Sequence, residues 1–284
     1  MCKEIANLKH FYELLSVRPN IADMHFGGGT PSYLDQGQFK QLVDALNTLS
    51  PLSSMDEVAM EIDPRTVTQD DLRHYASLGV SRISFGVQDF DPEVQKAINR
   101  IQPAEMIDAL LTKEIRSLFR GVNFDLLYGL PLQTHETIER TIDQTLEFAP
   151  DRITLLKYCH VPEVRKHMKL IRDADLPPPE ELPVMFVNIA HRLLAAGYVW
   201  IGLDHFAKPT DALAIAQMSG TVGRTFNGFT PGRTRDMIGI GPTTTSAIGS
   251  HYAQSYYDLN DYYNAVNKGE FPIQRGCSLT YDDG

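Results

Sequence analysis

The feature that most constrains the fold of this chain is a regular alternation of short apolar runs with longer amphipathic stretches. The runs are rich in β-branched and aromatic residues, as strands buried on both faces are. In the stretches between them, apolar residues recur at helical spacing, as Phe39, Val43 and Leu46 do in 36–49. This order predicts a parallel sheet covered by helices. The predicted strands are 21–26, 58–62, 82–87, 122–127, 153–158 and 198–203, and the predicted helices are 36–49, 68–78, 103–119, 134–148, 179–196 and 259–266.

The spacing of these strands indicates the architecture. They begin about 25 to 45 residues apart, which suits a barrel or partial barrel at least as well as an open doubly wound sheet. After residue 206 the alternation weakens, and residues 208–245 are rich in Thr, Gly and Pro. We therefore predict an incomplete βα barrel over residues 1–207. Residues 208–284 are expected to form an extension of the barrel and the start of a C-terminal region.

Small or polar residues end each predicted strand. In βα barrels the carboxyl ends of the strands converge on the ligand, so polar groups at all of these ends predict a binding or catalytic site there. Each of them taken alone also suits a turn or a helix cap. The residues concerned are 27–30, Glu61, Gln88, Asp89, 129–131, Cys159, His160, Asp204 and His205.

Composition narrows the possible partners and cellular locations. Of 284 residues, 36 are acidic and 26 are Lys or Arg, so the formal net charge is −10. This balance argues against a nucleic-acid backbone or an anionic membrane as the main partner. The three cysteines are far apart, the N-terminal residues are charged, and no run approaches about 18 apolar residues. We therefore expect a cytoplasmic protein with neither a disulfide framework nor a membrane span.

Two acidic residues lie in apolar strands, where an unpaired charge is costly. Glu61 ends the second predicted strand, where it either binds a hydroxyl or ammonium group or forms a salt bridge with Arg65 or Arg82. Asp125 lies among apolar neighbours in the fourth strand, where it either belongs to a ligand site or forms a buried pair with Arg100. The residues alone leave both choices open.

Glycines and histidines at the strand ends suggest two further interpretations. Because glycine lacks a Cβ atom, the backbone of residues 27–29 can approach a ligand closely, although three glycines also suit a tight turn. His25, His160, Asp204 and His205 raise the alternative of a metal-dependent barrel hydrolase, but they form no HxH or HExxH motif.

Several short sequence motifs are spread over most of the chain. They are HFGGGTP (25–31), EIDPR (61–65), SFGVQDF (84–90), DLLYGLP (125–131), DADLP (173–177) and GLDHFA (202–207). Together they resemble the oxygen-independent coproporphyrinogen III oxidase (coproporphyrinogen dehydrogenase) family of radical S-adenosylmethionine (SAM) enzymes, from about residue 20 to the end. The DHFA block favours the oxidases over the related heme-chaperone branch.

The resemblance implies a fold, an activity and cofactors. It implies a partial (β/α)6 barrel of the radical-SAM, TIM-like type, with SAM at the strand ends. Family enzymes use a [4Fe–4S] cluster to cleave SAM, and the resulting 5′-deoxyadenosyl radical attacks the propionate side chains of coproporphyrinogen III. Oxidative decarboxylation then gives protoporphyrinogen IX in heme biosynthesis. An electron donor or acceptor is the further partner, and the complete protein is expected to be a monomer.

The resemblance also assigns residues to two SAM molecules, position by position. Gly28, Glu61 and Thr245 fall where the family contacts the cluster-bound SAM. The positions that match a second SAM site in the family are Gly29, Thr30, Gln88, Arg100, Asp125 and Cys159.

The chain departs from the family pattern in three ways. It lacks the family's CxxxCxxC motif, and Cys2, Cys159 and Cys277 are isolated, so no metal-ligating residues are expected in this chain. The segment around Thr245 is altered, because relatives have an aliphatic residue there. The family's C-terminal helical domain does not follow Gly284.

These departures lead us to expect a barrel that lacks its first strand and cluster loop and ends before the helical domain. Such a chain is expected to be inactive as it stands, as a fragment of a full enzyme or a degenerate homologue. The main alternative is a non-catalytic module that binds SAM or a tetrapyrrole, and the metal-dependent hydrolase is a more distant one. Arg224 is a candidate for contacting substrate carboxylates.

Overall fold

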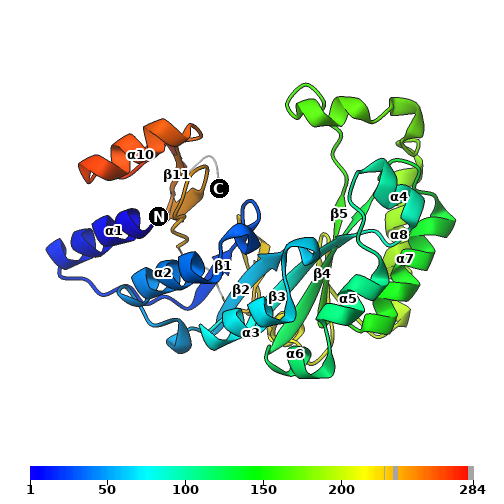
Figure 1. Cartoon of the computed structure of the whole chain (residues 1–284), viewed down its shortest axis with the longest axis horizontal. Coiled ribbons are helices and arrows are strands. Elements are labelled where there is room, and N and C mark those ends of the chain that lie inside the picture. Colours follow the sequence, from blue (N-terminus) through cyan, green and yellow to red (C-terminus); the bar gives the residue numbers. More distant parts are fainter. Residues whose placement is uncertain (227, 233–235, 281–284) are drawn as a thin grey trace.

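The computed structural model describes residues 1–226, 228–232 and 236–280. Its largest element is a curled seven-stranded sheet, wrapped as part of a barrel, with helices on its convex side (Figure 1). Neighbouring strands follow the order β1-β2-β3-β4-β5-β7-β6, and the first five are parallel. This confirms the predicted partial βα barrel. The strands are β1 (Asp23–Phe26), β2 (Glu57–Ile62), β3 (Arg82–Gln88), β4 (Gly121–Tyr128), β5 (Arg152–Lys157), β6 (Val199–Gly202) and β7 (His205–Ala207).

The helices that connect these strands carry their apolar faces into one core. Asp35, Thr68 and Thr134 begin three of them as N-caps, because each side chain accepts a hydrogen bond from the backbone N–H three residues on. Buried side chains from these helices pack with those of the strands into a single cluster. The helices on this side are α2 (Gln36–Asn47), α3 (Gln69–Ser77), α5 (Ala104–Leu110), α6 (Lys113–Ser117), α7 (His135–Phe148) and α8 (Glu181–Ala195).

The two faces of the sheet differ in polarity. Along β2, residues Val58, Met60 and Ile62 are buried in the core, whereas Glu57 and Glu61 alternate with them and point to the concave side. Strands β3 and β4 repeat this alternation over part of their length, whereas the first four residues of β5 are all buried. The strands were predicted to be apolar on both faces, and this is wrong because the sheet remains open on its concave side.

The sixth predicted strand, 198–203, is half of a hairpin. Gly202 pairs with His205 across a two-residue turn, and Leu203 in that turn has a φ of 47°. Strand β7 therefore runs antiparallel between β5 and β6. Six parallel strands were expected in the sheet, but the tight turn places the antiparallel strand β7 next to β5.

Four helical regions differ from the sequence prediction. The predicted helix 103–119 is two helices, α5 and α6, because Thr112 starts a new helix by accepting a hydrogen bond from the Ile115 N–H. Helices α1 (Cys2–Leu14), α4 (Pro92–Ala97) and α9 (Ala212–Met218) were not predicted.

A second, smaller part of the molecule joins the two ends of the chain (Figure 1). Helix α1 contacts α10 (Leu259–Lys268), and buried Glu4 of α1 accepts hydrogen bonds from Tyr262 Oη (2.6 Å) and the Gly241 N–H (2.9 Å). The strands of this part are β10 (Thr245–Ile248), β11 (His251–Ser255) and β12 (Ile273–Ser278), and β8 (Gly223–Thr225) pairs with β9 (Gly228–Thr230). Among the described residues, every helix is too short or too polar to cross a membrane.

Candidate functional site

Polar side chains line the concave face of the sheet in two groups. The first, at the amino ends of the strands, we call the lower network: Glu57, Arg82, Arg152 and Asp211. The second group, toward the carboxyl ends, is Glu61, Gln88, Arg100 and Asp125; together with the loop residues Gly28, Gly29 and Thr30 after β1, we call it the upper site.

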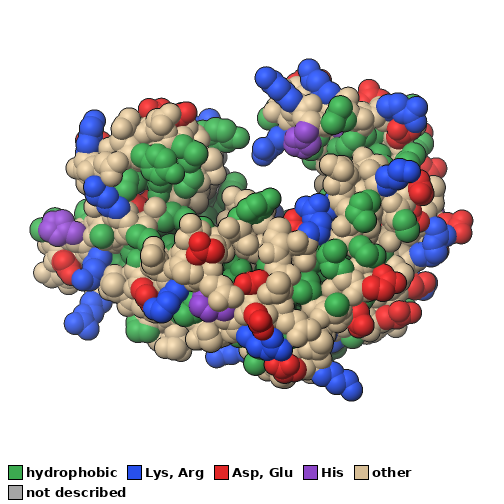
Figure 2. Space-filling view, viewed as in Figure 1, with side chains coloured by type: hydrophobic (Ala, Val, Ile, Leu, Met, Phe, Trp, Pro, Cys, Tyr) green, Lys and Arg blue, Asp and Glu red, His purple; other side chains and the backbone are tan. Residues whose placement is uncertain are grey.

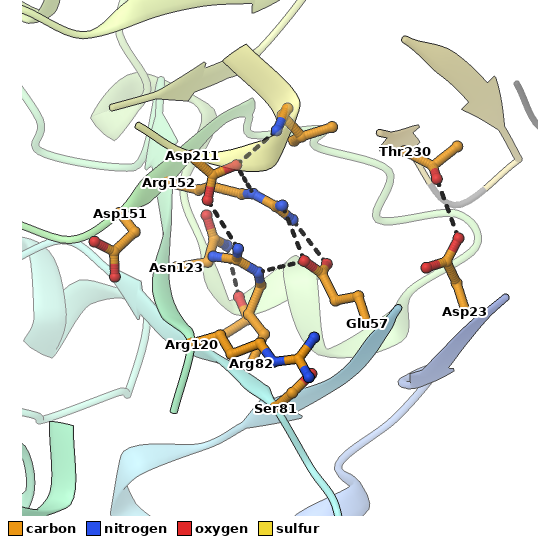
Figure 3. A network of polar contacts seen from close by, with 12 residues as sticks. Asp23, Glu57, Ser81, Arg82, Arg120, Asn123, Asp151, Arg152, Asp211 and Thr230 are labelled. Atoms are coloured by element: carbon orange, nitrogen blue, oxygen red, sulfur yellow. Dashed lines mark hydrogen bonds and ion pairs between the residues drawn. The ribbon is translucent and has the colours of Figure 1, made fainter. Parts of the chain in front are cut away.

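The lower network is a closed set of ion pairs (Figure 3). Arg82 donates to Glu57 at 2.9 Å and to Asp211 at 2.8 Å. Arg152 donates twice to Glu57, at 2.8 and 2.9 Å, and once to Asp211, at 2.8 Å. Burial alone would raise the pKa of both carboxyl groups, but the two guanidinium charges hold it below the ordinary value. Each carboxylate thus has two guanidinium partners, and of the described arginine nitrogens here only Arg82 Nη1 is buried without a hydrogen-bond partner, so we assign the lower network a structural role.

Asp125 has neutral partners. Ser84 Oγ on β3 donates to its Oδ2 at 2.6 Å, and Asn123 Nδ2 donates to its Oδ1 at 2.8 Å. Burial raises the pKa of Asp125, and the negative charge of Glu61 raises it further. The predicted buried pair of Asp125 with Arg100 is wrong, because the strand register places Ser84 and Asn123 against this carboxylate instead.

Glu61 faces the same concave side from β2. Its Oε1 lies 3.0 Å from His25 Nε2, and its side chain is 41% exposed. A Cβ atom on Gly27 would lie within 2.7 Å of both of these atoms, so glycine leaves room for the pair. The predicted salt bridge of Glu61 with Arg65 or Arg82 is wrong, because both arginines pair with other carboxylates.

The glycine loop after β1 offers open backbone. Gly28 and Gly29 have φ angles of 75° and 148°, which favour glycine. A Cβ atom at either position would meet nothing within 4 Å, so the space beside this backbone is free. Thr30 follows and caps the short helix η1 (Pro31–Tyr33). A ligand can therefore approach the main chain closely here.

Gln88 and Arg100 are positioned by a backbone irregularity. Gln88 has a φ of 68°, and the pairing of β3 with β4 shifts between Gly86 and Gln88, which redirects the Gln88 side chain. Arg100 Nη2 donates to the Gly86 carbonyl at 2.9 Å and lies 3.6 Å from Asp63 Oδ2. A Cβ atom on Gly86 would lie 3.0 Å or less from the side chains of Gln88 and Arg100, so glycine at this position leaves room for both.

Two of the residues predicted to bind SAM, Cys159 and Thr245, lie outside the upper site. Cys159 is exposed and lies two residues after the end of β5. Thr245 begins β10 and pairs with Gln254 in the three-stranded sheet. Among the described residues, no hydrogen bond or ion pair joins Thr245 to the upper site. The SAM roles of all nine residues remain predictions.

The proposed metal-hydrolase residues are separated. His25 contacts Glu61, His160 contacts a tyrosine hydroxyl at 3.1 Å, and Asp204 contacts His205 at 2.6 Å. Over residues 1–226, 228–232 and 236–280, no three His, Cys, Asp or Glu side chains gather as metal ligands. Each of these groups thus contacts a different neighbour among the described residues, and the hydrolase alternative stays a prediction.

The three cysteines do not fit an iron–sulfur cluster either. Cys2 lies on α1, Cys159 follows β5, and Cys277 lies on β12, and all three are exposed free thiols. A [4Fe–4S] cluster takes several thiolates held close together. The described residues of this chain offer no such set.

Ser84, Asn123 and Gly86 contact the predicted site residues but were not among the candidates. A signal was present, since polar or small residues occupy alternate positions 82, 84, 86 and 88 of β3 and 123 and 125 of β4. This period of two is typical of a strand with one polar face.

Comparison with known proteins agrees with this geometry. The model of the radical SAM superfamily matches residues 4–145. The oxygen-independent coproporphyrinogen III oxidase of Pseudomonas aeruginosa is 40% identical over 271 residues, which cover 95% of this chain and 59% of the relative. The Escherichia coli K12 protein of the same name is 40% identical over 265 residues, 93% of this chain and 58% of the relative.

A solved structure shows the same fold. Coproporphyrinogen III oxidase from Escherichia coli, described as a radical SAM enzyme, superposes with a TM-score of 0.92 at 37% identity, over 99% of this chain and 64% of that one. The chain thus spans roughly three fifths of the length of the curated relatives it matches. By these matches the chain belongs to the radical SAM superfamily, and it is similar over nearly its whole length to the oxygen-independent coproporphyrinogen III oxidases.

Proposed function

We propose that the upper site binds SAM and that the chain serves the oxygen-independent oxidative decarboxylation of coproporphyrinogen III to protoporphyrinogen IX. The observation that carries this proposal is the open glycine backbone beside two carboxylates, Glu61 and Asp125, that have no arginine or lysine partner among the described residues. The relatives named above act on coproporphyrinogen III by name, and they support the choice of substrate.

Charge complementarity supports SAM as the ligand. SAM carries a sulfonium and an ammonium group, and the charge of Glu61 already disfavours the ionised form of Asp125. A cation bound between these carboxylates would relieve that repulsion. Carboxylates also accept hydrogen bonds from ribose hydroxyl groups, and such charge-assisted bonds are strong. Bound SAM is the source of the radical in this family.

The proposed roles follow the position of each residue. Gly28, Glu61 and Thr245 are assigned to one SAM molecule. The open main chain at Gly28 lets the ligand approach, and Glu61 holds its ammonium group while His25 orients the carboxylate. The residues assigned to a second SAM molecule are Gly29, Thr30, Gln88, Arg100, Asp125 and Cys159.

One observation favours a second candidate function. The three cysteines of this chain lie in separate elements and do not form a cluster site. A module that binds SAM or a tetrapyrrole without turning it over would need no cluster. The second candidate is therefore a non-catalytic binding module with the same upper site.

Titration calorimetry with SAM tests the site common to both candidates. We expect the unaltered protein to bind SAM and Glu61→Gln to weaken binding about tenfold or more, since hydrogen bonds to charged groups are worth roughly 1.5–3 kcal/mol. Glu114→Gln is the matched control, because Glu114 is an exposed carboxylate bound by Arg73 on the far side of the sheet. No binding by the unaltered protein, or equal effects of the two variants, would exclude the proposed site.

Anaerobic reconstitution with iron and sulfide separates the two candidates. With isolated thiolates, we expect the purified chain to retain far fewer than about four irons. A stable cluster with visible absorption and about four irons per chain would favour the catalytic candidate on this chain alone.

A further inference from the structure

Residues 158–180 form an arm that leaves the large sheet after β5 and returns to α8 (Figure 1, green). The arm contains the short helices η4 (Lys166–Leu170) and η5 (Asp173–Asp175). It rises from the carboxyl-end edge of the sheet and overhangs the concave side. The arm is the one large excursion from that edge in Figure 1.

The arm is strongly basic in an acidic protein. Residues 157–172 contain five Lys or Arg residues and one acidic residue, although the whole chain has a net charge of −10. Arg172 is paired with Asp175 through two hydrogen bonds, at 2.6 and 2.8 Å. Among the described residues no side-chain hydrogen bond or salt bridge engages the other four cations, which are exposed: Lys157, Arg165, Lys166 and Lys169.

The basic side chains face a hollow. Figure 2 shows Lys and Arg side chains at the overhanging end of the arm, across a deep hollow from the part that contains α10. In Figure 1 the arm leaves the carboxyl end of β5, and the upper site lies toward the carboxyl ends of the neighbouring parallel strands. A ligand held by the arm would therefore lie above the upper site.

The base of the arm is anchored, so its direction is defined. The Leu132 N–H donates to the Asp175 carbonyl at 2.7 Å, which ties the returning end to the loop before α7. His160 Nε2 lies 3.4 Å from Asp173 Oδ1, which joins the outgoing and returning ends. Three of the four unpartnered cations, Arg165, Lys166 and Lys169, lie along the chain between these anchors.

We infer that Arg165, Lys166 and Lys169 form a binding site for the carboxylate groups of a polycarboxylate tetrapyrrole. The inference rests on the proposed function and adds to it the part of the chain that recognises the substrate. Coproporphyrinogen III carries four propionates around a ring, so it needs several cations spread over a surface, and guanidinium and ammonium groups supply them. Arg224, the earlier candidate, has its guanidinium 5.8 Å from the centre of the Phe229 ring.

The test compares two triple variants that lose equal positive charge. The arm variant is Arg165→Gln, Lys166→Gln and Lys169→Gln, and the control is Lys96→Gln, Lys113→Gln and Lys268→Gln. The control lysines are exposed, have no side-chain partner among the described residues, and lie on α4, α6 and α10. The probe is coproporphyrin III, the air-stable oxidised tetracarboxylate, followed by fluorescence quenching. Deuteroporphyrin IX, which has two carboxylates, is the second probe.

We expect the arm variant to bind coproporphyrin III about tenfold more weakly than the unaltered protein, and the control to change little. The loss should be smaller for deuteroporphyrin IX, and raising the salt concentration should reduce the difference between variant and unaltered protein. SAM affinity should be the same in all three proteins. A charge-preserving variant, Arg165→Lys with Lys166→Arg and Lys169→Arg, should restore binding.

Three outcomes would contradict the inference, and each leads to a different conclusion. Equal coproporphyrin affinity in the arm and control variants would overturn this inference and leave the proposed function standing. Absence of coproporphyrin binding by the unaltered protein would overturn both. Arm-dependent binding to phosphatidylserine vesicles, with coproporphyrin affinity unchanged, would assign the arm to an anionic membrane surface and also overturn the inference.

Discussion

In the lower network each carboxylate lies between two guanidinium groups, whereas in the upper site Glu61 has a histidine partner and Asp125 has neutral donors. Both groups lie on the concave face of the same strands. Mutual pairing lowers the pKa of Glu57 and Asp211, whereas burial beside a like charge raises that of Asp125. The comparison teaches that two sets of carboxylates on one sheet face differ in their partners: arginines neutralise those at the base of the half-barrel, whereas those nearer its open edge have neutral or histidine partners among the described residues.

The largest expected effect comes from breaking the lower network. Arg152→Met leaves Glu57 and Asp211 buried with one guanidinium each, which should cost about 3–5 kcal/mol of unfolding free energy in urea titrations. SAM affinity of the folded protein should be retained. Arg140→Met is the control, because the Arg140 side chain is 54% exposed in both of its salt bridges and its loss should change little. Equal destabilisation by both variants would contradict the structural role.

In the upper site, by contrast, we expect a substitution to lower SAM affinity more than it lowers stability. Asp125→Asn keeps the shape of the side chain and removes its charge, so SAM affinity should fall about tenfold or more while stability is nearly kept. Calorimetry and thermal unfolding on the same sample measure both quantities. A lowered thermal midpoint with unchanged affinity would place Asp125 with the structural charges instead.

Gly121 tests how closely the backbone packs against the lower network. A Cβ atom there would collide with the Arg82 guanidinium, whose position is fixed by Glu57 and Asp211. Gly121→Ala should therefore destabilise the fold by about 1–3 kcal/mol in urea titrations. At Gly232 a Cβ atom would meet nothing within 4 Å, so Gly232→Ala should have little effect and serves as the control.

The smallest expected effect is a difference in pH dependence. Because the folded-state pKa of Glu57 is lowered, its stabilisation is present above its ordinary pKa of 4.5 and is lost as the pH falls through the folded-state value. Because the folded-state pKa of Asp125 is raised, its ionisation costs stability as the pH rises above its ordinary pKa of 3.8.

Unfolding measurements over this pH range check both signs. The stability deficit of Glu57→Gln should shrink on acidification. Asp125→Asn should match the unaltered protein at the most acidic pH and gain on it as the pH rises. The same trend in both variants would show that the two groups do not differ as described.

Much of the fold could be predicted because it depends on local pattern. All six predicted strands and most predicted helices occur where the apolar periodicity placed them, because neighbouring residues determine which face of an element is buried. The hairpin of β6 and β7 was missed because a two-residue turn at Leu203 and Asp204 reverses the chain within one apolar run. Helix α1 was missed because its apolar face packs partly on α10, from the far end of the chain.

The candidate site was predictable in its residues and not in its partners. Glu61 and Asp125 stood out by their chemistry, but the sequence suggested Arg65, Arg82 or Arg100 as their partners. Parallel pairing of strands 20 to 40 residues apart decides which side chains meet on one face, and a single sequence does not state that register.

The sequence by itself determined the alternation of strands and helices, the family and the acidic residues at the carboxyl ends of the strands. The tertiary structure alone decided that Glu57, Arg82, Arg152 and Asp211 meet at the base of the sheet, and that the basic arm overhangs the upper site. The physical reason is the separation along the chain over which each interaction acts. Periodicity and capping act over a few residues, whereas ion pairs and binding surfaces join segments up to 154 positions apart, as Glu57 and Asp211 do through their shared arginines.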